Sequence, residues 1–139
     1  MMAITQAMCT SFKEECFKEG HQMATDTIKI ALYTSSADIN ATTTAYSTTA
    51  EISGTGYSAG GVALTSQTVA TSGTVAYFDA ADPEWTTASF TANCALIYNS
   101  TNSNKAIAVL AFGGDFTVAA GTFKIVFPAA GTTAIIRID

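Results

Sequence analysis

The sequence predicts a mostly β fold: a single antiparallel β-sandwich or jelly-roll-like domain with one amphipathic α-helix at its N-terminus. Three observations lead to this prediction. Apolar residues recur with a helical period only within the first 20 residues and alternate with polar residues afterwards. Clusters of Gly, Ser, Thr and Asn divide the later apolar residues into short runs. No helical pattern lies between these runs, which excludes a parallel α/β sheet.

Residues 1–20 are expected to form the helix, with about four turns. Ile4, Met8 and Phe12 recur every four residues, and charged side chains fill the opposite face. Gly20 stands where a helix commonly ends. Two roles remain open for this helix: it covers an edge of its own sheet, or it reaches a neighbouring protein.

Residues 21–139 are expected to form the sandwich, in one structural unit with the helix. Ile28, Ile30 and Leu32 alternate with other residues as in a strand. The polar run 99–104 between two apolar runs predicts a hairpin loop. We expect strands at residues 27–33, 62–70, 73–78, 86–91, 93–98, 105–112, 122–127 and 133–138.

A long surface loop is expected at residues 34–50, which consist almost entirely of Thr, Ser, Ala, Asn and Asp. The glycine-rich residues 54–61 predict turns or a bulge. Tyr46 and Tyr57 lie in these segments and are the aromatic residues most expected at the surface. Six other aromatic residues are expected in the core: Trp85, Phe90, Phe112, Phe116, Phe123 and Phe127.

The composition is poor in charge: 12% of the residues are charged, against about 25% in a typical soluble domain. A surface of Thr, Ser and Ala suits packing against other proteins, although it also fits a simple soluble sandwich. The net charge is −5 and the six basic residues are scattered, which argues against nucleic-acid binding. We find no signal-peptide pattern and no apolar run long enough for a membrane span, so cytoplasmic synthesis is expected.

The sequence offers little for catalysis. Its one histidine, His21, is expected to interact with the dipole at the helix C-terminus. Cys9, Cys16 and Cys94 are expected to be small buried side chains. The acidic cluster between 79 and 84 (Asp79, Asp82 and Glu84) lacks the spacing of a calcium loop and is expected to form a solvated turn. We therefore expect no enzyme, no catalytic residues, no cofactor and no metal site.

Five segments carry a resemblance to a known family. They are ITQAMCTSFK (4–13), IKIALYTSSA (28–37), EISGTGY (51–57), ALIYNS (95–100) and AIIRI (134–138). Together they resemble a family of small virion structural proteins of tailed bacteriophages. The resemblance spans nearly the whole chain and keeps the segments in order.

The resemblance implies a structural protein present in many copies in the virion. Head decoration (cement) proteins, which bind the major capsid protein and often form dimers or trimers, are the first expectation. A tail, neck or fibre component that contacts tail proteins or a host receptor is the alternative, and a depolymerase is a remote third. The candidate protein-contact residues are Met8, Phe12, Phe17, Tyr46 and Tyr57.

Overall fold

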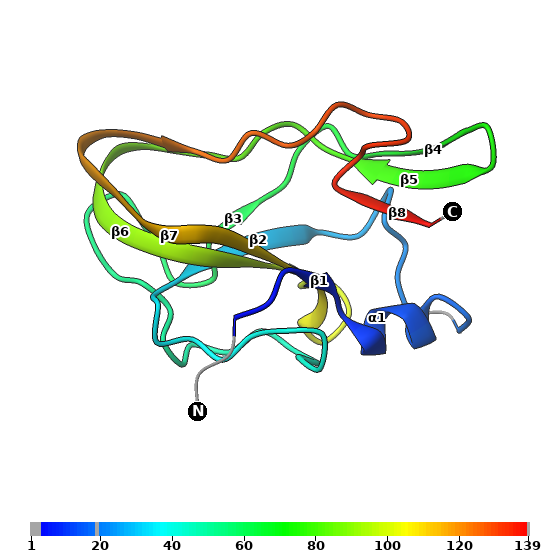
Figure 1. Ribbon diagram of the computed structural model, residues 1–139, viewed down its shortest axis with the longest axis horizontal. Coiled ribbons are helices and arrows are strands. Elements are labelled where there is room, and N and C mark those ends of the chain that lie inside the picture. The colour runs from blue at the N-terminus through cyan, green and yellow to red at the C-terminus, as the bar shows by residue number, and fades with distance from the viewer. Residues whose placement is uncertain (1–3, 19, 139) are drawn as a thin grey trace.

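Two long strands, β6 (Glu84–Asn99) and β7 (Lys105–Lys124), form the antiparallel hairpin that dominates the fold (Figure 1). The computed structural model describes residues 4–18 and 20–138. The hairpin turns at the polar run between Asn99 and Lys105, as the sequence predicted. It is the centre of a five-stranded sheet with the order β1-β7-β6-β2-β3. The other strands are β1 (Ala7–Met8), β2 (Ile28–Tyr33) and β3 (Val62–Ala63).

A second antiparallel sheet, of three strands, has the order β4-β5-β8. Its strands are β4 (Thr68–Ser72), β5 (Val75–Asp79) and β8 (Ile136–Ile138). Strands account for 46% of the residues and helix for 4%. The mostly β, antiparallel, sandwich-like prediction is therefore confirmed.

The core is centred where β2, β6 and β7 lie side by side. In β2 only Lys29 is not buried, and Ile30 and Leu32 pair with Ile97 and Ala95 of β6. All five residues 106–110 of β7 are buried. An uninterrupted apolar run of this kind is expected of a strand covered on both faces.

The expected strands 105–112 and 122–127 belong largely to one strand, because Gly113 and Gly114 do not end it. Between the pairs Ala92–Phe116 and Cys94–Ala111, β7 uses more residues than β6, so the extra ones bulge at the glycines. The expected strands 86–91 and 93–98 likewise join in β6. Glycine's tolerance of positive φ (+84° at Gly113) permits the bulge without breaking the strand.

The four-turn helix predicted for residues 1–20 is wrong in length; within the described residues the helix is α1, Thr10–Glu15. Ala7 and Met8 are instead strand β1, paired with Val109 and Ala108 at the edge of β7. Residues four apart also lie on the same face of a strand, because side chains alternate between the two faces. The spacing that suggested a helix therefore fits a strand as well. Backbone pairing with an otherwise open sheet edge decides the conformation.

The loop expected at residues 34–50 is confirmed, with one isolated bridge, Ala45–Lys105, within it. The expected strand 62–70 is interrupted, because Ser66 has a positive φ of 54°. Gly61 allows the approach to β2: a Cβ there would lie 1.8 Å from the Ile30 carbonyl oxygen.

The expected aromatic core is confirmed in part. Trp85, Phe90 and Phe127 are buried, and Phe112 and Phe123 are half-buried. Phe116 is 53% exposed, so its assignment to the core was wrong. It follows the bulge of β7, where β6 is the only paired strand.

Candidate protein-contact site

An open groove lies between α1 and β8. These two elements lie at the right of Figure 1. The groove has a volume of about 640 Å³ and is lined by Met8, Lys13, Cys16, Phe17, Arg137 and Ile138. We call it the α1–β8 groove. Three of these residues, Cys16, Arg137 and Ile138, also line a smaller hollow of about 120 Å³ against β5. The side chains from α1 and β8 thus form one surface from two distant parts of the sequence.

This surface exposes large apolar side chains. Phe17 is 94% exposed, Ile138 is 54% exposed, and Val69 beside the smaller hollow is 54% exposed. Isolated apolar residues on a surface are ordinary, but apolar residues gathered around a groove are typical of a contact site. Phe17 and Met8 were both predicted as contact residues, and both line the groove.

Phe12, the third predicted contact residue of this segment, is 3% exposed and belongs to the core. It lies on the inner side of α1, where its ring packs against His21 with centroids 4.9 Å apart. Its interpretation as a free contact residue was therefore wrong. Its role is to fix α1 to the sheets below, so that Phe17 can project outward.

Tyr46 and Tyr57, the remaining predicted contact residues, do not lie at the groove and are half-buried. Their hydroxyls donate to the two carboxylate oxygens of Glu51, at 2.7 and 2.6 Å. The Gly60 backbone N–H donates to the same carboxylate at 2.7 Å. We call these four residues the Glu51 cluster. It ties the long loop to β2, because Tyr57 also accepts from the Leu32 N–H.

The environment of the Glu51 cluster strongly favours protonated tyrosines. Burial, with the adjacent Glu51 carboxylate, raises the pKa of both Tyr46 and Tyr57 far above the ordinary value of 10.0. Burial and Glu51 also raise the pKa of Tyr98, whose ring stacks on Tyr46, to about 12. These hydroxyls serve as structural donors at neutral pH.

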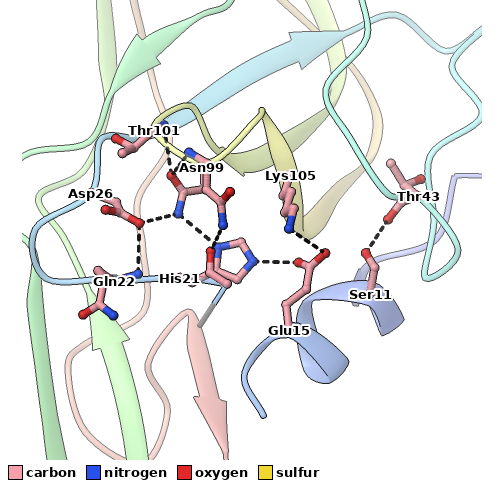
Figure 2. A network of polar contacts seen from close by, with 11 residues as sticks. Ser11, Glu15, His21, Gln22, Asp26, Thr43, Asn99, Thr101 and Lys105 are labelled. Carbon is pink, nitrogen blue, oxygen red and sulfur yellow. Dashed lines mark hydrogen bonds and ion pairs between the residues drawn. The ribbon is translucent and has the colours of Figure 1, made fainter. Parts of the chain in front are cut away.

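A polar network holds α1 against the hairpin tip (Figure 2). Glu15 at the end of α1 contacts His21 Nε2 at 2.7 Å and Lys105 Nζ at 3.9 Å. The Asn99 amide nitrogen is 3.0 Å from His21 Nδ1 and 2.8 Å from Asp26. We call Glu15, His21, Asp26, Asn99 and Lys105 the Asn99 network.

Asn99 determines which His21 nitrogen carries the proton. Its side-chain oxygen accepts from the backbone N–H groups of Thr101 and Asn102, at 3.0 and 3.1 Å. The amide NH₂ must therefore face His21 Nδ1, which accepts. His21 is then the neutral tautomer protonated at Nε2, which donates to Glu15.

His21 thus differs from its expected role at the helix end. Its side chain is 1% exposed and binds the Glu15 side chain, not the terminal carbonyls of α1. Gly20 still closes the turn after α1: its N–H donates to the Glu15 carbonyl at 3.3 Å. A Cβ at Gly20 would lie 2.6 Å from the Glu15 Cβ, so a larger residue would displace the network.

Asp26 completes the network on the far side of Asn99. The Asn99 amide and the Gln22 backbone N–H donate to its carboxylate, which lowers its pKa below the ordinary 3.8. Asn99 is the one buried polar residue of the described part of the chain. All of its side-chain hydrogen-bonding groups are used, as burial requires.

The cysteine predictions hold at two of three positions. Cys9 and Cys94 are buried, and burial raises their pKa to about 11 and about 12. Cys16 is exposed in the α1–β8 groove, so its burial was wrongly predicted. Burial of part of the side chain and the nearby Glu15 raise the pKa of Cys16, which disfavours the reactive thiolate at neutral pH.

The acidic cluster at the start of β6 has structural contacts. Asp82 accepts from the Phe127 backbone N–H at 2.9 Å, and Glu84 is opposite Lys124 in the hairpin. In residues 4–18 and 20–138, no group of three or more His, Cys, Asp or Glu is arranged to hold a metal ion. In the same ranges, no helix is long and apolar enough to cross a membrane.

Sequence reasoning missed Glu15, Glu51 and Asn99 as organising residues. Asn99 opens an Asn- and Ser-rich loop and was interpreted only as a turn residue. Glu51 carried a usable signal, since it and Asp38 are the only charged residues between 34 and 61. An isolated carboxylate accepts strong hydrogen bonds from nearby hydroxyl and backbone N–H groups, such as those of tyrosines and glycines.

Comparisons with protein-family models, curated proteins and solved structures give no match.

Proposed function

We propose that this chain is a non-catalytic structural protein of a tailed-phage virion, and specifically a decoration protein that binds and stabilises the major-capsid lattice. The observation that carries the proposal is the α1–β8 groove, where Phe17 is 94% exposed beside Met8 and Ile138. Exposed aromatic side chains are characteristic anchors of protein interfaces. The segment resemblance to small virion proteins directs the proposal to a phage particle.

The low charge of the chain supports a role in a repetitive assembly. Charged residues are 12% of the sequence, so little charge must be desolvated when the Thr- and Ser-rich surface packs on another protein. Weak contacts suffice when copies associate as dimers or trimers and each copy meets the same lattice, because multivalency raises the overall affinity.

The experiment is a stripping and re-addition assay on purified capsids. Capsids without this protein should lose integrity at a lower temperature, and adding back the purified chain should restore the original value. The variant Phe17→Ser should restore it less well. Val126→Ser is the matched control, because Val126 is 73% exposed but does not line the groove. Unchanged capsid melting on stripping would reject the decoration role.

The alternative is a tail, neck or fibre component. A polar hollow of about 320 Å³ in the long loop favours it, because Asp38, Asn40, Thr42 and Ser47 line that hollow. Loops on a rigid sheet commonly carry recognition. Immunogold labelling of intact virions separates the two roles, since decoration requires many copies on the head and none concentrated on the tail.

A further inference from the structure

We propose that the α1–β8 groove binds an extended acidic segment of a partner protein, which adds as a strand alongside β8. Apolar side chains of that segment would pack on Phe17 and Ile138, and its carboxylates would meet Lys13 and Arg137. This inference rests on the proposed function, since it specifies the chemistry of the partner at the same surface.

The first supporting observation is the open edge of the three-stranded sheet. β8 pairs with β5 on one side, through Ala76–Ile138 and Phe78–Ile136, and is the last strand of its sheet. In the described part of the chain, residues 135–138 take part in no backbone–backbone hydrogen bond outside this ladder. Their outward N–H and C=O groups are therefore available to a further strand.

The second observation is the charge of the groove. Among residues 4–18 and 20–138, the charged side chains that line it are Lys13 and Arg137, both cations, and no carboxylate of those residues lines it or the adjoining hollow. Lys18, in contrast, has a carboxylate partner, Glu14, at 3.4 Å. In residues 4–18 and 20–138, Lys13 has no ion pair, and Arg137 has only a hydrogen bond from Nη1 to the Ala134 carbonyl at 2.9 Å.

The same charges disfavour a second copy of this chain as the occupant. A symmetric contact through matching grooves would bring Lys13 and Arg137 toward their own copies. Like charges across an interface oppose association, and none of the described residues that line the groove supplies a carboxylate to offset them. The chain as a whole has a net charge of −5, so a groove with two cations is a local exception that suits an acidic partner.

The third observation is that α1, which forms one side of the groove, is held in place by contacts with the rest of the fold. Glu15 fixes the end of α1 through His21 and Lys105, and the buried Phe12 fixes its inner side. Phe17 follows directly after this anchored segment. A preorganised surface loses less conformational entropy on binding than a mobile one.

The test uses the full chain and two short acetylated peptides, one alternating valine with glutamate and the other alternating valine with lysine. Fluorescence anisotropy should show the glutamate peptide binding about tenfold more tightly. A third peptide, in which the backbone nitrogens of both the valines and the glutamates are methylated, should bind much more weakly because neither of its edges can donate to a strand ladder.

Two variants and two controls locate the binding. Lys13→Glu combined with Arg137→Glu should reverse the preference between the peptides, whereas Lys124→Glu, at the far end of β7, should preserve it. Phe17→Ser should weaken binding of the glutamate peptide about tenfold, and Val126→Ser should leave it unchanged.

Cys16 gives a readout in the unaltered chain. It is exposed in the groove while Cys9 and Cys94 are buried, so iodoacetamide should modify Cys16 first. The glutamate peptide should slow this modification, and the lysine peptide should not.

Equal binding of the glutamate and lysine peptides, or unchanged binding by the double variant, would overturn the inference. So would self-association of the chain that Phe17→Ser abolishes, because the occupant would then be a second copy. The capsid assay is independent of these results. If the chain distinguishes the peptides but does not bind capsids, the proposed function is rejected and the acidic preference of the groove is retained. If the chain binds capsids but does not distinguish the peptides, the proposed function is retained and the acidic preference is rejected.

Discussion

The Glu51 cluster and the Asn99 network perform the same task by different chemistry. Each fastens a segment that lacks long strands to the five-stranded sheet. In the Glu51 cluster, one carboxylate receives two tyrosine hydroxyls and one backbone N–H. In the Asn99 network, a neutral amide connects a histidine, a carboxylate and the hairpin backbone.

The difference between them predicts opposite responses to pH and unequal responses to mutation. The tyrosine donors of the Glu51 cluster ionise only in alkali, whereas Asp26 of the Asn99 network loses its charge only in acid. The second also contains the more deeply buried centre, because Asn99 is 0% exposed while Glu51 is half-buried. The following experiments are ordered from the largest expected effect to the smallest.

Asn99→Ala should lower the free energy of unfolding by roughly 3 kcal/mol, because two backbone N–H groups and two side chains lose their partner in the interior. Urea unfolding followed by tryptophan fluorescence measures the change. Asn93→Ala is the matched control in the same strand: its amide bonds Asp115 at an exposed position, so an effect within about 0.5 kcal/mol is expected. Equal effects at the two positions would contradict the importance of the network.

Glu51→Gln should destabilise the fold by roughly 2 kcal/mol, because an amide has one acceptor oxygen where the carboxylate has two. Its NH₂ would also oppose one of the donors now bound. Glu84→Gln, at an exposed position of β6, should have little effect in the same urea experiment. The loop 34–50 should become more susceptible to limited proteolysis in Glu51→Gln alone.

Alkali should weaken the Glu51 cluster. The raised pKa of Tyr46, Tyr57 and Tyr98 means that the folded chain retains protons which the unfolded chain releases above the ordinary value of 10.0. Stability is therefore complete below that pH and falls as pH rises above it. The urea midpoint measured from pH 8 to 11 should show this fall, less steeply in Tyr46→Phe. An equally steep fall in that variant would exclude Tyr46 as a source.

Acid should weaken the Asn99 network, with the smallest effect of the set because Asp26 is only half-buried. The lowered pKa of Asp26 adds stability that is complete above the ordinary 3.8 and disappears as pH falls through the folded-state value. Asp26→Asn should flatten the acid side of the stability profile. Glu84→Gln controls for the change in net charge, and the same flattening there would contradict the assignment to Asp26.

The sequence patterns predicted some secondary-structure elements correctly. The alternation of Ile28, Ile30 and Leu32 correctly indicated β2, and the polar run after Asn99 correctly indicated the hairpin turn. Both are local signals, since side-chain period and turn chemistry act within a few residues. Met8 and Phe17, two of the predicted contact residues, line the α1–β8 groove.

The failures concern residues whose conformation or exposure depends on distant partners. Ala7 and Met8 became a strand because the edge of β7 was available to pair with them. Tyr46 and Tyr57 are half-buried because both of their hydroxyls donate to the Glu51 carboxylate. Phe116 is exposed because, beyond its bulge, β7 pairs with β6 alone.

The sequence by itself determined the fold class and the presence of a helix near its start, but not the length of that helix. Period and turn residues encode these features locally. Only the tertiary structure decided that α1 and β8, more than 100 residues apart, would form one groove whose described charged side chains, Lys13 and Arg137, are both cations. It also decided that Asn99 would fix the His21 tautomer, because hydrogen bonds across such separations arise only when the sheets assemble.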